Sequence, residues 1–336
     1  MNIPRKSLAI AALLPLGLLT ACGGSGGEAE GGDGNVELTF AHSYTQDQPP
    51  HRCGAQVIKE EAEGADVGLT VEIYDSSQLG GDADRIASVA SGDIDIDLQG
   101  ASALSALHTP IGMVDAAYVF EDGQHLTDFF RSEASDDLVG AFEEASQVNV
   151  LGAWSIGARH FTANSPIRTP EDLDGLRMRF PGSPQFLQNA EALGAAATEV
   201  AYEELYLALQ QGTVDGQENP LTNIDSQNMA EVQDYLSLSG HSLNSNLIVV
   251  GPVWDELDAE QQEALQAAIA TAEDRMVECV AEAEEELLNE YRSGDRIEIV
   301  DDVDVEAFQE RTDAWYRENL EGEQLAAFEA IRGSAE

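Results

Sequence analysis

The chain has 336 residues, of which 63 are acidic and 16 basic, so its formal net charge at pH 7 is −47. Such a charge argues strongly against nucleic acid as a partner, because the phosphate backbone binds basic surfaces. Intrinsic disorder is excluded by a hydrophobic fraction of 43% with clear periodic patterns. The chain is long enough for two lobes with separate cores, and its near lack of lysine suits a salty medium that screens repulsion between carboxylates.

The first 21 residues have the features of an export signal. Two basic residues precede an apolar run, and Leu19-Thr20-Ala21-Cys22 matches a bacterial lipobox. We expect cleavage before Cys22 and attachment of a diacylglycerol to its thiol, which would anchor the protein at the outer face of the cell membrane. An ordinary secretory signal with an incidental cysteine is the alternative. Residues 22–35 are expected to be a flexible tether, and no other apolar run reaches roughly 18 residues.

Two further cysteines, Cys53 and Cys279, remain in a chain that is expected to enter an oxidising compartment. A disulfide between them is one interpretation, and two separate buried thiols are the other. Their spacing offers no metal site, and we expect no metal and no cofactor.

Strands and helices alternate in the first third of the chain. The expected strands are 36–42, 69–74 and 94–98, and the expected helices are 49–63 and 82–91. This order predicts a doubly wound α/β lobe. Ligands of such sheets bind beyond the carboxyl ends of the strands, where His42, Asp75 and Gln99 fall.

A second lobe is expected to begin near Val148. Its expected strands are 148–154, 160–164, 177–180, 247–250 and 297–300. A helix is expected to start at 169, and three more are expected at 183–193, 202–211 and 305–320. Residues 258–291 contain no proline or glycine and predict a single helix long enough to span both lobes.

Three polar residues of the second lobe are ligand candidates. Arg179 lies in a short strand between Met178 and Phe180, where a guanidinium needs an anion, and its fork matches a carboxylate by two parallel hydrogen bonds. Arg159 lies at the edge of another strand, and Asn219 follows the Asp215-Gly216 turn. In so acidic a chain, an internal salt bridge would also satisfy Arg179, so its chemistry alone leaves both interpretations open.

Several segments together resemble the DctP-type solute-binding subunit of TRAP (tripartite ATP-independent periplasmic) transporters. The most specific is Val-Asp-Gly-Gln-Glu-Asn-Pro at 214–220, and the others are 78–80, 91–95, 157–164, 169–179, 193–195, 204–213 and 231–241. The resemblance runs from about Leu38 to the C-terminus. It implies two doubly wound lobes joined by hinge strands and the long helix, as in periplasmic binding proteins. Lobe I would comprise 36–156 with about 245–282, and lobe II 157–244 with about 283–332.

The resemblance also implies an extracytoplasmic receptor that binds a small organic acid between two closing lobes and delivers it to the small and large permease subunits. The family's carboxylate-binding arginine falls on Arg179, its second arginine on Arg159 and its amide on Asn219. The lobe I candidates are His42, Tyr44, Asp82 and Gln99; some relatives carry an acidic residue near Gln99. Trp154, His160 and Tyr202 are expected either to line the cleft or to pack in the core.

Two other functions are compatible with parts of the sequence. Asp215 and Glu218, expected to form a carboxylate pair on a loop with His241 in the same lobe, offer the paired acids of a glycosidase. A turn at Asp215-Gly216 and the position of Glu218 beside the ligand amide explain them better, and no nucleophile elbow, phosphate loop or zinc spacing occurs. We therefore expect no enzyme. The substrate-binding lipoprotein of an ATP-driven (ABC) transporter shares the two-lobe design and is the closer alternative.

Overall fold

The computed structural model describes residues 35–335, so the expected signal, tether and Cys22 lie outside the described residues. Nine strands form one mixed sheet in the order β2-β1-β3-β8-β4-β7-β5-β6, and β9 pairs with β8. The strands are β1 (Val36–Ala41), β2 (Leu69–Tyr74), β3 (Ile96–Gln99), β4 (Asn149–Ala163), β5 (Arg177–Phe180), β6 (Ala196–Glu199), β7 (Gly216–Pro220), β8 (Tyr235–Val250) and β9 (Glu298–Val300). The predicted α/β class is confirmed.

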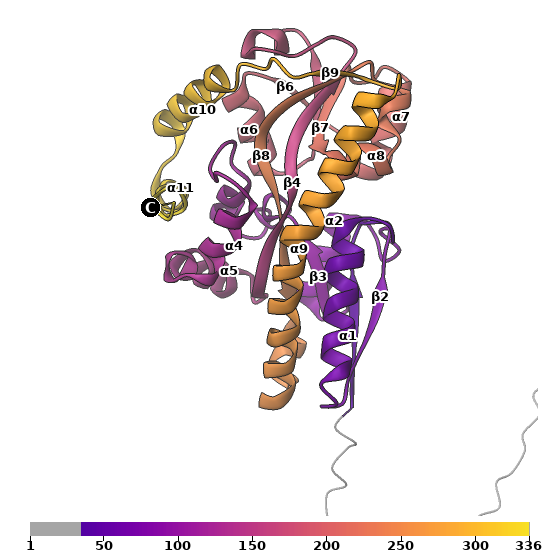
Figure 1. Cartoon of the computed structure of the whole chain (residues 1–336). Coiled ribbons are helices and arrows are strands. Elements are labelled where there is room, and N and C mark those ends of the chain that lie inside the picture. The colour runs from indigo at the N-terminus through magenta and orange to yellow at the C-terminus, as the bar shows by residue number, and fades with distance from the viewer. Residues whose placement is uncertain (1–34, 336) are drawn as a thin grey trace, which may run out of the picture. The chain divides into compact units, whose positions relative to one another are not determined.

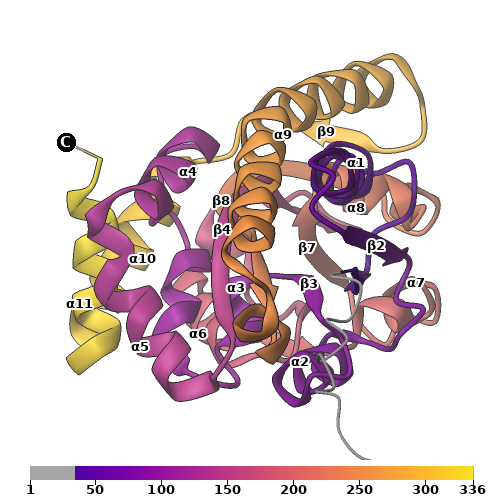
Figure 2. The ribbon, with the colours of Figure 1, turned by 90° about the horizontal axis from the view of Figure 1, so that it is seen from below.

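Helices cover both faces of this sheet (Figures 1 and 2). They are α1 (Gln56–Gly64), α2 (Asp82–Ser91), α3 (Ala101–Leu104), α4 (Gly123–Arg131), α5 (Asp136–Ser146), α6 (Pro184–Leu193), α7 (Leu205–Gln210), α8 (Leu221–Ser226), α9 (Ala259–Ser293), α10 (Val305–Asn319) and α11 (Gly322–Gly333). Shorter helical turns include η1 (Pro50–Ala55), η2 (Thr109–Asp115), η4 (Pro170–Leu173) and η5 (Tyr202–Glu204). Within residues 35–335, no helix combines the length and apolarity needed to cross a membrane.

Two long antiparallel strands, β4 and β8, run through the whole sheet and join its two halves (Figure 1). We call β1, β2 and β3 with 149–155 and 245–250 the first half, and β5, β6 and β7 with 158–163 and 235–243 the second half. Each half includes the helices and loops that follow its strands in the chain. The β4–β8 register shifts between Ser155 and Ala158. A bulge bends its strand locally, and this one lies at the boundary between the two halves.

Helix α9 packs along β4 (Figure 2) and contacts it both before and after this bulge. Glu273 of α9 accepts a hydrogen bond from the Ala153 amide at 2.9 Å, and Glu284, three turns further on, accepts one from the Ala158 amide at 3.2 Å. The predicted lobe-spanning helix of residues 258–291 is therefore confirmed in its extent, and two of its carboxylates attach it to the joining strand.

Gly157 makes the second of these attachments possible. Its φ of +107° lies in the left-handed region, and a Cβ there would collide with Oε1 of Glu284. Replacing Gly157 by alanine should cost about 1–3 kcal/mol of unfolding free energy from backbone strain, with more from the collision. Gly175→Ala is the matched control, because its φ is +80° and no atom lies within 4 Å of its added Cβ. Denaturant titrations in which both variants lose the same stability would contradict the collision.

Glu284 should also make stability depend on pH. Burial raises the pKa of Glu284 from 4.5 to about 7, and the Ala158 hydrogen bond offsets this only in part. An acid whose pKa is raised by folding contributes stability at low pH that is lost as the pH rises through about 7. Glu284→Gln should therefore equal the wild type near pH 4 and exceed it by on the order of 2 kcal/mol near pH 8. Parallel pH profiles of unfolding free energy for the two proteins would contradict this expectation.

A disulfide joins Cys53 of η1 to Cys279 of α9, with their Cα atoms 6.5 Å apart. It closes a loop across a sequence separation of 226 residues. The sequence left open a disulfide or two separate thiols, and the structure contains the disulfide. Cys53→Ser should lose ~2–4 kcal/mol of unfolding free energy. The wild type in reductant should match the variant, whereas a variant as stable as the oxidised wild type would contradict the bridge.

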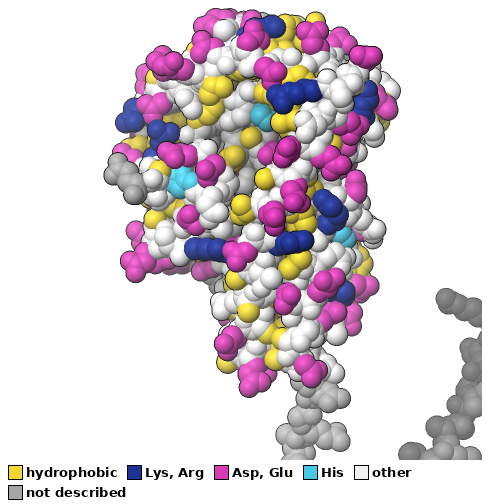
Figure 3. Space-filling view, viewed as in Figure 1, with side chains coloured by type: hydrophobic (Ala, Val, Ile, Leu, Met, Phe, Trp, Pro, Cys, Tyr) yellow, Lys and Arg dark blue, Asp and Glu magenta, His cyan; other side chains and the backbone are white. Residues whose placement is uncertain are grey.

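Several segments differ from the sequence expectations. The two strands expected at 148–154 and 160–164 form one strand, β4, and the strand expected at 247–250 is only the end of β8. The Asp215-Gly216 turn leads directly into the buried strand β7, so Glu218 does not lie on a loop. Residues 101–147, for which no element was predicted, form short helices that pack beside β4. Carboxylates are spread over the whole visible face, and basic groups are few (Figure 3).

Candidate ligand-binding site

Arg179 lies in β5, between two strands with which it pairs in parallel, β6 and β7. Its neighbours Met178 and Phe180 are fully buried in the core of the second half, and Arg179 itself is only 1% exposed. Its Nε donates to the Val200 carbonyl at 2.8 Å, whereas its buried Nη1 has no hydrogen-bond partner among residues 35–335. The internal salt bridge that the sequence left open is absent from this described part of the chain, in which no carboxylate lies within ion-pair distance of Arg179.

Burial lowers the pKa of Arg179 to about 10, although the nearby negative charge of Glu218 opposes the shift. The side chain is thus a desolvated cation that is still charged at neutral pH. A buried charge without a partner is costly, and the arrangement favours any anion that can reach the free edge of this guanidinium.

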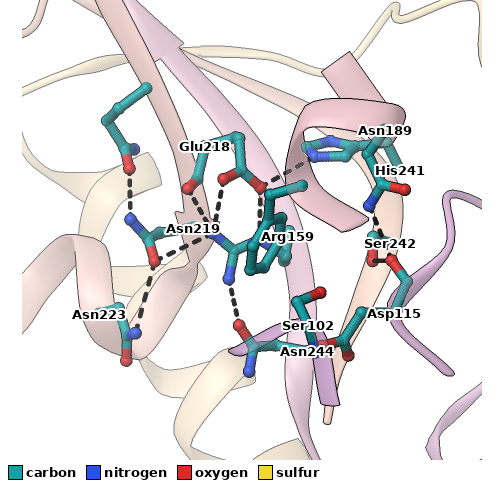
Figure 4. Close-up of polar contacts among 12 residues, drawn as sticks. Ser102, Asp115, Arg159, Asn189, Glu218, Asn219, Asn223, His241, Ser242 and Asn244 are labelled. Atoms are coloured by element: carbon teal, nitrogen blue, oxygen red, sulfur yellow. Dashed lines mark hydrogen bonds and ion pairs between the residues drawn. The ribbon is translucent and has the colours of Figure 1, made fainter. Parts of the chain in front are cut away.

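Arg159 is in the opposite situation. Its guanidinium lies between Glu218 and Asn244 (Figure 4) and forms a two-pronged ion pair with the Glu218 carboxylate, in which Nη2 and Oε1 are 2.6 Å apart. Nη2 also donates to the Glu218 carbonyl at 2.7 Å and to Asn219 Oδ1 at 3.3 Å, and Nη1 donates to Asn244. The Phe186 ring lies 4.6 Å from its central carbon. The charge of Arg159 is therefore compensated within the protein.

The antiparallel pairing of β4 with β7 brings these partners together, since Phe161 lies opposite Glu218 and Arg159 opposite Pro220. His241 of β8 stacks on Phe161 at 4.2 Å and reaches Glu218 Oε2 through Nε2 at 3.3 Å. Burial alone would raise the pKa of Glu218, but the Arg159 charge and the His241 hydrogen bond hold it below its usual value. Burial also lowers the pKa of His241, so a neutral imidazole supports an ionised Glu218.

The first half contributes a second buried network. Arg85 of α2 donates to Asp97 of β3 at 3.0 Å and to Asp82 at the start of α2 at 2.9 Å. Gln99, at the carboxyl end of β3, donates through Nε2 to Asp97 at 2.7 Å. Burial raises the pKa of Asp97 to about 7 despite the Arg85 charge. The network fixes the positions of Asp82 and Gln99, which both face the cavity described next.

A cavity of about 570 Å³ lies between the two halves. Seven of the residues predicted from the sequence line it: Tyr44, Asp82 and Gln99 from the first half, and Arg159, Arg179, Tyr202 and Asn219 from the second. Its volume is in the range of small-molecule binding sites. Residues more than one hundred positions apart in sequence thus meet around one space.

Three other predicted residues do not line this cavity. His42 is fully buried behind Tyr44, where its Nδ1 accepts from the Tyr44 amide at 3.2 Å, and burial lowers its pKa to about 3. Trp154 is fully buried in the core of the first half, against Gly54 and Met276. His160 accepts from the Gly240 amide at 3.0 Å. Packing accounts for each of the three.

Asn244 and Asp115 are two of the buried cavity residues that the sequence did not predict. Asn244 lies in the polar centre of β8 and accepts from Arg159. Asp115, at the end of η2, accepts from the amides of Ser102 at 2.7 Å and Ser245 at 2.9 Å, which attaches α3 to β8 at the cavity wall. In the sequence, Asn244 and Asp115 each appear as a polar residue beside an apolar run. That pattern is also typical of a loop, so it did not identify them as site residues.

The carboxylates weighed as a glycosidase pair each have an arginine partner. Asp215 pairs with exposed Arg177 at 2.6 Å, while Glu218 pairs with buried Arg159. Neither carboxylate needs an exogenous partner, so this pair gives no support to hydrolytic chemistry.

Comparisons with known proteins agree on one family. The profile of "Bacterial extracellular solute-binding protein, family 7" (DctP) matches residues 40–323. The C4-dicarboxylate-binding periplasmic protein DctP of Rhodobacter capsulatus is 33% identical over 246 residues, which are 71% of this chain and 72% of that protein. An uncharacterised Sinorhizobium fredii protein is 32% identical over 82% of this chain, which spans only about half (51%) of that relative.

Solved structures agree as well. A TRAP periplasmic solute-binding protein of Roseobacter denitrificans, solved with bound L-galactonate, has a TM-score of 0.81 and 28% sequence identity. The match covers 88% of this chain and 98% of that one.

Proposed function

This chain belongs to the DctP family of bacterial extracellular solute-binding proteins, family 7, and on that premise we propose how its cavity captures a ligand. It is the extracytoplasmic receptor of a TRAP-type transporter and works with that transporter's membrane subunits. The similarity to TRAP receptors does not favour the ATP-driven alternative. A small organic acid binds in the cavity between the two halves, with its carboxylate on Arg179.

One observation carries this proposal: Arg179 lines the cavity, and its buried Nη1 has no hydrogen-bond partner and its guanidinium no carboxylate partner in residues 35–335. A ligand carboxylate would supply the missing charge through two parallel hydrogen bonds. Arg159, which Glu218 and Asn244 hold in place, and Asn219, whose Nδ2 donates to Gln217, also line the cavity and would bind other oxygens of the ligand. Tyr44, Asp82, Gln99 and Tyr202 would contact the rest of the ligand.

We further propose that the two halves are the lobes of a closing trap, with lobe I at 36–156 and about 245–282 and lobe II at 157–244 and about 283–332. Hydrogen bonds between the two halves are of the kind that closure would form. Gln48 donates to Asn223 at 2.9 Å, and Ser77 donates to Glu203 at 3.0 Å, each pair joining the first half to the second. A ligand that touches both halves would stabilise the state in which these contacts form.

A thermal-shift screen against small acids and their uncharged analogues tests the proposed function. An acid at a hundredfold excess over its Kd should stabilise the protein by about 2.7 kcal/mol, and the analogue without the acid group should not. A strong stabiliser that carries no acid group would overturn the proposal.

The N-terminal lipid anchor is part of the same proposal. Its support is the lipobox at Leu19–Cys22, a sequence feature outside the described residues. Cells that express the full chain should incorporate labelled fatty acid into it and retain it in the membrane fraction, whereas Cys22→Ser should be unlabelled and released. Equal labelling of the two proteins would reject the anchor and leave the receptor function untouched.

A further inference from the structure

The charges that line the cavity are unequal. Two arginines and five acidic residues contribute to its wall, the acids being Asp82, Asp84, Asp115, Glu199 and Glu203. Glu218 already compensates Arg159. Among the described lining residues, Arg179 is therefore the one cation whose charge an ion pair with the protein does not balance.

The wall contributed by the first half presents hydrogen-bond acceptors. Both described hydrogen bonds to the Asp82 carboxylate, from Arg85 at 2.9 Å and from Ser43 at 3.0 Å, end on Oδ1, so no described residue donates to Oδ2. Gln99 uses its Nε2 to donate to Asp97 and to the Asp82 carbonyl, which orients its amide, and no described residue donates to its Oε1. Carboxylate and amide oxygens of this kind accept hydrogen bonds from a ligand and cannot donate them.

Asp82 also acts on the ligand site electrostatically. Its side chain is 49% exposed, and its negative charge favours the charged form of Arg179 on the other side of the cavity. Arg85, which pairs with Asp82, is shared with fully buried Asp97 and does not line the cavity. A second carboxylate on the ligand would thus meet the negative charge of Asp82 and, among the described lining residues, no further unpaired cation, and such juxtaposition of like charges disfavours binding.

Resting on the proposed function, we infer that the ligand carries a single carboxylate, bound by Arg179, and hydrogen-bond donors at its other end, bound by Asp82 and Gln99. Hydroxylated monocarboxylates such as sugar acids have this chemistry, and dicarboxylates do not. The acidic wall excludes the second carboxylate, which is specificity by repulsion as well as by attraction. The 570 Å³ cavity accommodates a chain of several carbon atoms.

Matched pairs of acids test this inference by calorimetric titration of the full folded chain. L-galactonate and galactarate share a six-carbon hydroxylated chain and differ in whether the far carbon is an alcohol or a carboxylate; erythronate and tartrate form a shorter pair. In the pair that binds, we expect the monoacid to bind on the order of a hundredfold more tightly. The set of 4-hydroxybutyrate, 4-aminobutyrate and succinate asks whether the donor is a hydroxyl or an ammonium group.

Asp82→Asn should reduce this discrimination on the order of tenfold, because the amide removes the like charge. The matched control is Asp93→Asn, which makes the same change of charge at an exposed site just beyond α2, away from the cavity. The control should keep the wild-type preference. A diacid that binds as tightly as its monoacid partner, or an Asp82 variant with unchanged preference, overturns the inference.

The outcomes also separate the inference from the proposed function. A preferred diacid whose binding disappears in Arg179→Ala rejects the single-carboxylate inference and leaves the arginine site intact. Absence of binding by every acid in the panel overturns the inference, and binding that is indifferent to Arg179 overturns the proposed function itself.

Discussion

Replacing Arg179 by alanine should abolish ligand binding. The ligand carboxylate would lose its only uncompensated cationic partner in the described cavity wall, and truncating one member of a desolvated charge pair costs ~2–5 kcal/mol. The fold should survive, because removing a buried charge without a counter-ion also removes its desolvation cost. Calorimetric titration with the best stabiliser of the thermal-shift screen measures the effect.

Arg179→Lys tests the geometry of the same contact. Lysine keeps the charge but lacks the planar fork, so we expect binding at least about tenfold weaker than in the wild type. The matched control is Arg177→Ala, two residues away in the same strand, because Arg177 is exposed and pairs with Asp215. Near-wild-type affinity in the lysine variant would contradict the two-pronged contact.

Replacing Glu218 by glutamine should strongly destabilise the fold. It leaves the buried Arg159 charge without a counter-ion, and breaking a buried pair from one side costs about 3–5 kcal/mol. The comparison is Asp215→Asn, which breaks the exposed pair with Arg177, where both side chains are at least one-third exposed and the expected loss is below about 1 kcal/mol. Denaturant titrations of both variants measure the difference. Equal stability losses would show that burial of the Arg159–Glu218 pair is not what makes it important.

Local patterns predicted local elements well. The strand at Leu69–Tyr74 and the helix at Asp82–Ser91 were predicted to the residue, because alternation marks the strand and Gly92, with φ of +82°, ends the helix. The long helix was predicted from its lack of proline and glycine, and the structure caps it with Asp258 and Gln261. In these segments, propensity and tertiary packing favour the same conformation.

The polar centre of β8 was missed for a physical reason. Residues 241–246 are rich in serine and asparagine, which favour loops when considered alone. In the fold these residues surround Arg159 and Asp115: Asn244 accepts from Arg159, and the Ser242 hydroxyl donates at 2.9 Å to the carbonyl of Asp115, which is 127 positions away in sequence. Tertiary contacts therefore overrode local preference at the part of the strand that serves the site.

The site itself was only partly predictable. The types of residue around Arg179 indicated an anion site. Only the fold shows that Glu218 forms an ion pair with Arg159 and that Arg179 Nη1 has no partner among the described residues. Trp154, Arg159 and His160 lie on a strand whose register shifts between Ser155 and Ala158 and again between Arg159 and Phe161. Simple alternation fails at such bulges, so the sequence did not reveal which of these side chains faces the cavity.

The most direct measurement is a crystal structure with the acid that stabilises the protein best. We predict that both oxygens of its carboxylate lie about 2.7–2.9 Å from nitrogens of the Arg179 guanidinium, with Arg159 still paired to Glu218. A carboxylate bound elsewhere, with Arg179 Nη1 still lacking an anionic partner, would contradict the account.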